Sequence, residues 1–504
     1  MRGLAGCRRT MARALAIGLV AGASLAAADP LPSAGPGPAT PPGADLLQVR
    51  GAVHVHTSFS TGLEGLEQVA ERAVEQGIGV LVLADDDLLR IEYGVPFLRN
   101  LVRFGHSEDA VIDRLGLERY LEEIRRIDAA HEDLIVIDGV ESAPFYYWTR
   151  DPDGTWVVRH WNKHLMAVDL RTAEAYAGLP VLGGRAIWSW RWSSLLLLWP
   201  AIGLLYAFWM GRRVHGWWLR GPVAAVCILS LADSAAVGFK VPEMDAYHGD
   251  LGAAPYQRFI NYVAGRGGIA IWAHPEARST IAPRSLLGGA VRVVSRTGAH
   301  AEDLVETRDY HAFAALYGDN TTATDPGQQW DQVLVEHLRG ERASAPWGTG
   351  EIDYHEDEPG GRLQDISTVF LMRQRTRAEA LQALREGRVY AVRGGEQALR
   401  LQAFAVSTEA GAAVSGERVP AFGQARVFAA LERWDGAAGE EARLRLVRGD
   451  ASGARVVAEI TGAVPLELNR IDTDVDAERP VYYRVLASSR GSRLTSNPIF
   501  VGGR

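Results

Sequence analysis

The sequence has very little cysteine and very little lysine. Cys7 and Cys227 are the only cysteines in 504 residues, which excludes a disulfide framework. Lys163 and Lys240 are the only lysines among 53 basic residues, and we attribute this arginine bias to genomic base composition. The formal net charge of −8 gives no indication of nucleic-acid binding, and we expect none.

The overall composition is that of an ordinary globular protein. Hydrophobic residues make up 47% of the chain and charged residues 23%, which excludes general disorder, collagen and a coiled coil. A length of 504 residues suggests about three domains. Tryptophan is distributed unevenly, because half of the 14 residues lie between Trp188 and Trp218. That segment must differ from the rest of the chain.

The N-terminus has the pattern of a secretory signal peptide. Arginines up to Arg13 precede an apolar run over 14–25, and three alanines at 26–28 form a small-residue cleavage site. We predict a signal peptide over 1–28 and therefore export; an uncleaved anchor is the alternative. Residues 29–49 are rich in proline and glycine and are predicted to form a linker.

The central part of the chain alternates short apolar strands with amphipathic helices. Apolar residues at helical spacing over 63–74, followed by Gly77, predict a helix. The predicted strands are Ala52–Val55, Ile78–Leu83, Leu134–Ile137 and Gly268–Trp272. Unbroken apolar strands are typical of a parallel sheet that is covered on both faces. We therefore predict an α/β fold with a parallel sheet or barrel, divided between residues 50–185 and 244–396.

Residues 397–504 have a different pattern. Short strands separated by turn residues predict a small antiparallel β-sandwich. We see no catalytic residues in it and expect a supporting or docking role.

Metal-capable side chains follow the predicted strands. They are His54 and His56 on the first strand, Asp85–Asp87 after the second, Glu141 after the third, His274 after the fourth, and Asp353 and His355 after a strand near Trp347–Gly350. Because the carboxyl ends of parallel barrel strands meet at one mouth, these side chains should converge. Converged carboxylates repel one another unless cations neutralise them. The pattern predicts a multinuclear site for Zn, Mn or Fe.

Several of these features have simpler alternatives. An isolated His-x-His or Asp triplet is often a surface or core accident, and only the repetition at successive strands favours a metal site. Lys163, beside His164, could receive an anionic group or be an ordinary surface lysine. Tyr310, Phe313 and Tyr317 have the spacing of one helical face, which more often indicates core packing than a substrate wall. The histidines that follow no predicted strand are treated as background: His160, His248, His300, His311 and His337.

Taken together, the motifs resemble those of the PHP (polymerase and histidinol phosphatase) superfamily. The matching stretches are Gly51–Gly62, Ala84–Asp87, Gly139–Glu141, Lys163–His164, Ala273–Pro275 and Asp353–His355, in that order. Three further stretches look like the CehA/McbA type of hydrolase: Tyr310–Tyr317, Pro326–Asp331 and Asn497–Ile499.

The resemblance implies a distorted (β/α)7 barrel with up to three metal ions. It would assign His54, His56, Glu141 and Asp353 to the first ion; Glu141, His164 and the second motif to the second; and His274 and His355 to the third. Two positions depart from the usual pattern: Thr61 replaces an aspartate and Asp86 replaces a histidine. Asp86 can still bind a metal, whereas Thr61 is a poor ligand, which puts the third position in doubt.

The function implied is metal-dependent hydrolysis with two or three divalent transition ions. A metal-activated hydroxide would attack a phosphoester, or a carbamate or amide-like ester, of a small-molecule substrate. We place Lys163 and Asp85 among the catalytic residues. The alternative is a degenerate, non-catalytic barrel that acts as an envelope binding or scaffold module, an idea motivated by Thr61 and Asp86.

Residues 186–243 interrupt the barrel sequence with a hydrophobic segment. Ser193–Met210 carries no charge, and Trp217–Phe239 is mostly apolar apart from Arg220 and Asp233. Runs of this length are candidates for membrane-spanning helices. Since predicted ligands lie on both sides of the segment, the number of crossings must be even, as in a hairpin. We predict attachment to the periplasmic face of a bacterial inner membrane; an apolar hairpin packed on the barrel or in a dimer interface is the alternative.

Overall fold

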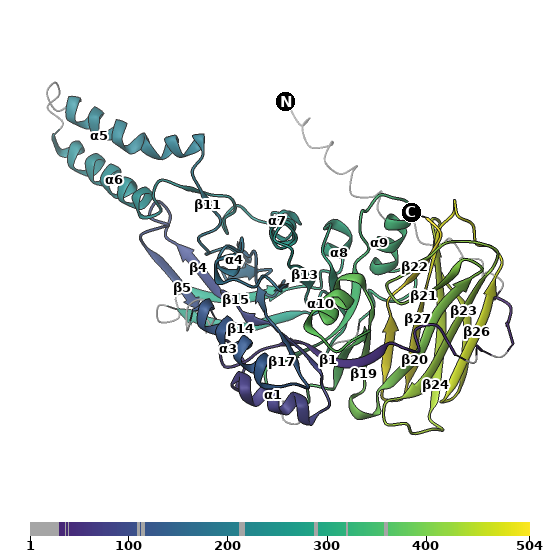
Figure 1. Ribbon diagram of the computed structural model, residues 1–504. Coiled ribbons are helices and arrows are strands. Elements are labelled where there is room, and N and C mark those ends of the chain that lie inside the picture. The colour runs from purple at the N-terminus through teal and green to yellow at the C-terminus, as the bar shows by residue number, and fades with distance from the viewer. Residues whose placement is uncertain are drawn as a thin grey trace, which may run out of the picture.

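The computed structural model describes residues 30–503, apart from 36, 39, 108–110, 112–115, 211–216, 287–290, 319–320 and 357–360. The signal peptide predicted over 1–28 lies outside these residues. Figure 1 shows three parts: a central α/β body, a C-terminal β domain beside it, and a pair of helices that projects away.

The strands of the central body close on themselves. In ring order they are β1 (Leu47–Val55), β2 (Val80–Leu83) continuing as β3 (Asp85–Asp86), β6 (Ile135–Ile137) continuing as β7 (Gly139–Ser142), β10 (Leu165–Val168), β13 (Ile269–Trp272), β16 (Ala312–Leu316) and β17 (Trp347–Tyr354). β17 pairs in parallel with β1, which completes the ring. The segments before and after the hydrophobic insertion therefore form one structural unit.

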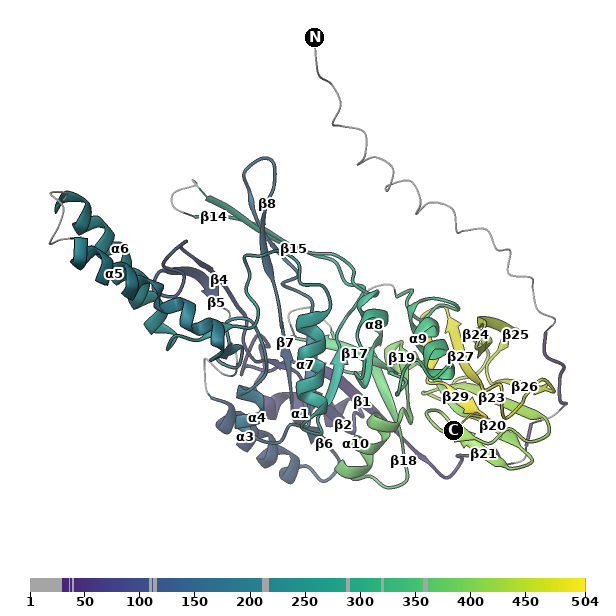
Figure 2. The ribbon, with the colours of Figure 1, turned by 90° about the horizontal axis from the view of Figure 1, so that it is seen from above.

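One strand of the ring runs against the others. β10 is antiparallel to both β7 and β13. The chain leaves β7 through a ribbon, β8 (Tyr147–Arg150) and β9 (Trp156–Arg159), instead of a helix, and a ribbon returns the chain in the opposite direction. The ribbon pairs with β15 (Val291–Thr297), which pairs with β14 (Ser279–Leu286), and this sheet extends from the body in Figure 2. As a result, β10 begins at the end of the ring where its neighbours finish.

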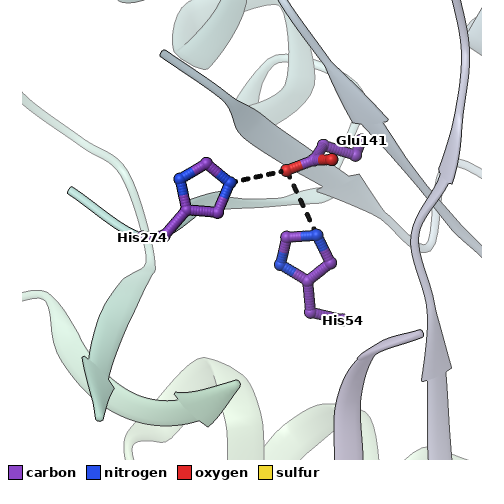
Figure 3. Close-up of side chains that lie close together, drawn as sticks. All are labelled: His54, Glu141 and His274. Atoms are coloured by element: carbon purple, nitrogen blue, oxygen red, sulfur yellow. Dashed lines mark hydrogen bonds and ion pairs between the residues drawn. The ribbon is translucent and has the colours of Figure 1, made fainter. Parts of the chain in front are cut away.

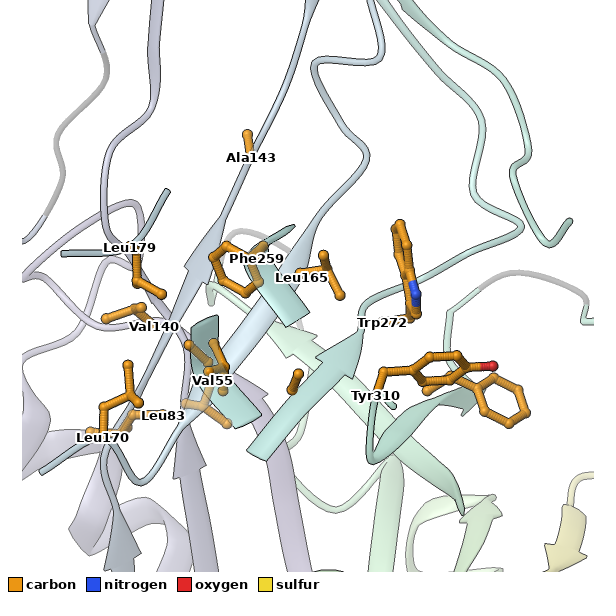
Figure 4. Close-up of a cluster of buried hydrophobic side chains, with 14 of the residues drawn as sticks. Val55, Leu83, Val140, Ala143, Leu165, Leu170, Leu179, Phe259, Trp272 and Tyr310 are labelled. Carbon is orange, nitrogen blue, oxygen red and sulfur yellow. The ribbon is translucent and has the colours of Figure 1, made fainter. Parts of the chain in front are cut away.

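Helices cover the outside of the ring. They are α1 (Leu66–Glu75), α3 (Leu117–Ala130), α4 (Ala173–Ala177), α7 (Ala254–Ala264), α8 (Asp303–Glu306), α9 (Gln329–Leu338) and α10 (Arg377–Glu386). The predicted helix over 63–74 is α1, whose Leu66, Val69 and Ala73 are buried. Leu63 lies before it and is exposed. Figure 4 shows the core between strands and helices, where Val55, Leu83 and Phe259 meet.

The helical spacing of Tyr310, Phe313 and Tyr317 was misleading. Residues 312–316 form strand β16, between β13 and β17, and not a helix; Tyr310 precedes the strand and Tyr317 follows it. A short apolar run fits a buried strand as well as a buried helix, so its spacing alone does not distinguish them. All three side chains are buried.

The C-terminal domain consists of two packed sheets. One contains β20 (Leu399–Thr408), β21 (Gly411–Val414), β23 (Ala425–Arg433) and β26 (Leu466–Asp472). The other contains β22 (Arg418–Val419), β24 (Glu441–Asp450), β25 (Gly453–Ala463), β27 (Val481–Ser489), β28 (Arg493–Ser496) and β29 (Ile499–Val501). The expectation of an α/β body with an additional β domain is confirmed at this level.

Strands and buried polar contacts join the two domains. β18 (Ile366–Met372) pairs with β1, β19 (Val389–Arg393) pairs with β18, and β28 of the C-terminal domain pairs with β19. Asp331 on α9 accepts hydrogen bonds from Tyr482 and Arg484 of β27. The predicted linker also contacts this domain, since Leu31 N donates to Val457 O.

The hydrophobic insertion is a helical hairpin. A 3-10 segment, η1 (Trp192–Leu198), leads into α5 (Trp199–Met210), and α6 (Trp217–Ala236) returns beside it. Its base is closed by β11 (Trp188–Ser189) and β12 (Val241–Pro242), and a second ribbon, β4 (Arg90–Gly94) with β5 (Arg103–Ser107), lies near it. Figures 1 and 2 both show the hairpin extending away from the body.

The hairpin exposes large apolar side chains. Trp192 is 83% exposed, Ile202 70% and Leu205 69%. By length and composition, one helical stretch of the described chain qualifies as a membrane span, Trp192–Trp209. Asp233, the acidic residue within the second predicted span, lies at the base, where both of its oxygens accept hydrogen bonds from Asn100.

Candidate metal centre

Glu141, at the end of β7, is the centre of a cluster of imidazoles. Its Oε1 lies 2.9 Å from His164 Nδ1, 3.1 Å from His54 Nε2 and 3.2 Å from His274 Nε2. Its Oε2 lies 3.5 Å from His56 Nε2. Figure 3 shows His54 and His274 pointing at the same carboxylate oxygen from different strands. The structure thus brings together five of the predicted ligands.

The remaining predicted ligands extend the cluster. Asp353 Oδ1 lies 3.2 Å from His54 Nε2, 3.5 Å from His56 Nε2 and 3.3 Å from His355 Nε2. Asp86 Oδ2 lies 3.6 Å from His56 Nδ1. Asp353 has a 43% exposed side chain, whereas Glu141 and His54 are buried, so the cluster opens to solvent on the Asp353 side.

Irregular backbone places these side chains. His54 has a φ of 71° and stands at a register shift of β1, where the pairing skips from Val53 to Val55. Asp353 and His274 also have positive φ, 52° and 28°. Left-handed backbone at non-glycine residues is costly and tends to occur at functional sites. The irregularity of β1 at His54 leaves its ring 5.1 Å from the ring of His56.

Antiparallel β10 explains why His164 joins the cluster. His164 precedes β10, and Met166 pairs with Glu141 across the sheet. Because β10 starts where β7 ends, its first residue reaches the same mouth as the last residues of the parallel strands. The sequence pattern alone offered no strand-end argument for His164.

Several imidazole nitrogens in the described part of the cluster lack the hydrogen bond that a buried polar atom normally makes. Among the described residues, His54 Nε2, His56 Nε2 and His164 Nδ1 are buried and make no hydrogen bond of acceptable geometry, although each lies close to Glu141. Buried polar atoms normally have partners. Three groups of residues bring ligand atoms within 4.8 Å of one another: His54–Glu141–His274, His54–His56–Asp353 and His56–Asp86–Glu141. This mixed nitrogen and oxygen set fits divalent transition metals.

The electrostatics agree with a site made for cations. Burial by itself would lower the pKa of His56, but Asp86, Asp353 and Glu141 raise it to about 10. Burial would likewise raise the pKa of Glu141, yet His164 and His54 hold it well below its usual range. In the metal-free protein Glu141 therefore stays charged, and His56 holds a proton that a cation would replace.

The two departures from the family pattern contact each other. Thr61 Oγ1 donates to Asp86 Oδ2 over 2.7 Å, and it lies 3.2 Å from His355 Nδ1. Asp86 thus places a carboxylate next to Thr61, and the threonine hydroxyl orients it.

Asp85, which we predicted to be catalytic, is buried beside the cluster. It accepts hydrogen bonds from Thr57 N over 2.8 Å, from Thr57 Oγ1 over 2.9 Å and from Ser60 Oγ over 2.7 Å. These bonds hold the loop that follows β1. Its catalytic role stays a prediction.

Lys163, the other predicted catalytic residue, is not a surface lysine. Its side chain is buried, and Nζ donates to Asp303 Oδ2 over 2.7 Å and lies 5.2 Å from the centre of the Tyr256 ring. The reach towards an anionic substrate group stays a prediction. His300, which we treated as background, is nearby, and burial followed by the charge of Lys163 lowers its pKa well below the ordinary value.

Sequence analysis missed Glu351, which is buried behind His54. Its Oε2 lies 3.2 Å from His54 Nδ1, and its Oε1 accepts a hydrogen bond from Thr349 over 3.0 Å. A carboxylate on the far nitrogen of a ligating histidine fixes the tautomer that presents the other nitrogen to a metal. The available signal was an acidic residue two positions before Asp353 on the same strand.

Replacing Glu351 should weaken metal binding without removing a ligand. For Glu351→Gln we expect about 10- to 100-fold lower affinity for zinc, because the carboxylate that orients His54 is lost. Competition with a chromophoric chelator measures this. Glu123→Gln, which breaks an exposed ion pair with Arg126 on α3, is the matched control. Equal zinc affinities in Glu351→Gln and the control would contradict the role.

The chain was compared with known proteins in three ways. No protein-family model matches it, and no curated protein matches it significantly. Among solved structures it is similar to a two-domain protein from Bacteroides vulgatus that contains a predicted PHP-like metal-dependent phosphoesterase, with 11% identity, a TM-score of 0.34 and coverage of 91% of this chain and 93% of that chain. A second is a proposed metal-dependent phosphoesterase from Bifidobacterium adolescentis, with 15% identity, a TM-score of 0.26 and coverage of 62% and 89%. Both likenesses are distant, so the function proposed below rests on the geometry of the cluster.

Proposed function

We propose that the protein is a metal-dependent hydrolase that acts on phosphoesters. The observation that carries this is the group of buried imidazole nitrogens that surrounds the Glu141 carboxylate. Such a set is costly to bury in the absence of a cation and is well suited to binding one. Two or three ions of Zn, Mn or Fe type match the three overlapping ligand groups.

Each residue has a defined role in this proposal. Glu141 would hold the metal ions with both of its oxygens, which face different imidazoles. Asp353 lies on the solvent side and links the cluster to the substrate entrance. Bound ions would supply Lewis acidity and lower the pKa of a water molecule. Asp85 and Lys163 would hold the loop after β1 and the wall beside His164 in position.

A second candidate substrate class for the same site is carbamate or amide-like esters. The alternative to an enzyme is a degenerate, non-catalytic scaffold. Against degeneracy, Asp86 replaces the missing carboxylate and the cluster keeps ligands from every predicted motif. Elemental analysis of the purified protein, followed by a broad hydrolase screen, tests both. We expect at least two transition-metal ions per chain and phosphoesterase activity; less than one ion per chain would favour the scaffold.

Proton release gives an independent test of the same site. At pH 7 the metal-free imidazoles hold protons, because carboxylates raise the pKa of His54 and His56 above 6.5. Zinc uptake should therefore release protons, and zinc affinity should rise with pH up to about 10, the pKa of His56. Calorimetry in buffers of different ionisation enthalpy measures the release. Uptake without proton release would contradict zinc binding at this cluster.

We also propose that the hairpin inserts into the bacterial inner membrane and leaves the metal centre on the periplasmic side. One half of the strand ring precedes the hairpin in the sequence and the other half follows it. Because the two halves form one ring, the hairpin must enter and leave the membrane on the same face. The stretch Trp192–Trp209 has 18 residues, which lies within the range of about 17–25 residues for a membrane-spanning helix. The apolar faces of Ile202 and Leu205 have no protein partner that would bury them in the described chain.

Acidic residues introduced into the hairpin should release the protein from the membrane. For Ile202→Asp with Leu205→Asp we expect loss of membrane attachment, since each charge at mid-span costs about 2.5–3.5 kcal/mol. Extraction of membranes with alkaline carbonate measures it. Phe422→Asp, an exposed apolar side chain on the C-terminal domain, is the control and should stay in the membrane fraction. Wild-type protein in the soluble fraction would refute the anchor.

A further inference from the structure

A cavity of about 550 Å³ lies at the base of the hairpin. Its wall includes the end of α6 with Asp233, the following Lys240, Arg99 in the loop of the β4–β5 ribbon, and Tyr247 from the body. It is separate from the metal ligands, none of which line it. A cavity of this size can hold a ligand head group.

The acidic side chains of the cavity are already engaged. Glu92 accepts a hydrogen bond from Arg103 over 2.9 Å. Asp233 accepts from Asn100 N over 2.7 Å and from Leu101 N over 3.0 Å. Asp245 Oδ1 accepts from Tyr247 N, and its Oδ2 lies 2.7 Å from His248 Nδ1.

Two cations of the cavity lack such partners. The Arg99 guanidinium lies over the Tyr247 ring at 3.9 Å, and it makes no ion pair with a carboxylate in the described part of the chain. Lys240 also has no carboxylate partner there and is exposed. The carboxylates of the cavity thus already accept hydrogen bonds, whereas Arg99 and Lys240 keep charged donors available for an anionic group.

Apolar and aromatic side chains surround the opening. On the β4–β5 ribbon, Phe97 in the loop is 88% exposed and Phe104 in β5 is 56% exposed. At the start of the hairpin, Trp190 is 59% exposed and Trp192 83%. Aromatic side chains beside basic ones are typical of the level of lipid head groups. These four aromatic side chains place the cavity at the membrane surface when the hairpin is inserted in the membrane.

We propose that this cavity binds the head group of one anionic phospholipid, whose phosphate pairs with Arg99 and Lys240. The acyl chains would run along the exposed faces of α5 and α6. The proposal rests on the membrane insertion proposed above, but not on the metal chemistry.

The test measures lipid retained by the full-length protein purified in detergent. Native mass spectrometry and phosphate analysis of extracted lipid should give about one phosphatidylglycerol-class lipid per chain. In Arg99→Gln with Lys240→Gln the retained lipid should fall at least about tenfold, as expected for two lost charge-assisted contacts. Arg119→Gln with Arg125→Gln, which removes equal charge from the exposed face of α3, should retain the lipid.

Three outcomes would overturn the proposal. Equal retention of zwitterionic and anionic lipid, or no loss in the Arg99/Lys240 variant, would refute a head-group site. Displacement of the lipid by millimolar inorganic phosphate would instead identify a site for soluble phosphate. Metal content is measured on the same samples. Wild-type protein that contains lipid but no metal would contradict the proposed hydrolase function without contradicting the lipid site. Carbonate extraction separately reports failure of the membrane anchor.

Discussion

Glu141→Gln is expected to abolish metal binding and hydrolysis together. The substitution keeps the size of the side chain but removes the one charge that four imidazoles surround, at 2.9 Å from His164, 3.1 Å from His54, 3.2 Å from His274 and 3.5 Å from His56. Replacing an outer partner of a metal ligand costs about 10- to 100-fold, so losing the shared ligand should reduce turnover by more than about 100-fold. Elemental analysis and phosphoesterase assays measure the two effects.

A comparison with neighbouring variants identifies the cause. Glu118→Gln, at the exposed start of α3, should leave both properties unchanged. His54→Ala with His56→Ala should lower metal content as Glu141→Gln does. If metal content is the same as wild type in both cluster variants, the metals bind elsewhere and the proposed centre is wrong.

Asp331→Ala is expected to reduce stability by about 3–5 kcal/mol, because it leaves a buried guanidinium without its counter-ion. Asp331 is 1% exposed and Arg484 0%, and two hydrogen bonds of 2.8 Å join them. Asp331 also accepts from Tyr482 over 2.6 Å. Since Asp331 belongs to α9 and the other two to β27, the loss should fall on the contact between the domains. Urea denaturation followed by tryptophan fluorescence measures it.

Two further variants show whether the buried charge is responsible. Asp435→Ala removes an ion pair with Arg433 at the surface and should cost less than about 1 kcal/mol. Asp331→Leu with Arg484→Met replaces the buried pair by apolar side chains and should recover much of the loss. A similar cost for Asp331→Ala and Asp435→Ala would show that the pair does not hold the domains together.

Contacts between the domains account for two sequence motifs to which no structural role was assigned, Pro326–Asp331 and Asn497–Ile499. Asn497 bonds to the backbone of β17 through Gly348 N, at 2.7 Å, and to Val389 O of β19, at 3.0 Å. Asn497 thus joins the C-terminal domain to β17, the strand that contains Glu351 and Asp353, and Asp331 joins the same domain to α9. The supporting role expected for this domain is therefore argued from specific contacts, although no substrate role follows from them.

The sequence patterns identified the metal-capable side chains but did not predict the backbone geometry that brings them together. His54, Glu141 and His274 were identifiable because strands of a closed ring end at one mouth, a property of local apolar runs and chain order. The bulge at His54 and the positive φ of Asp353 were not identifiable, because pairing with neighbouring strands imposes them. Lys163 shows the same limit: its ion pair with Asp303 joins residues 140 positions apart.

The amino-acid pattern on its own established the α/β body, the β domain after it, the apolar insertion and the set of metal-capable side chains, since each depends on local periodicity or composition. Only the tertiary structure decided that β10 reverses, that β16 is a strand, that Glu351 lies behind His54, and that Thr61 donates to Asp86. These depend on contacts between distant segments, whose geometry is set by the packing of the whole ring and not by any one stretch of sequence.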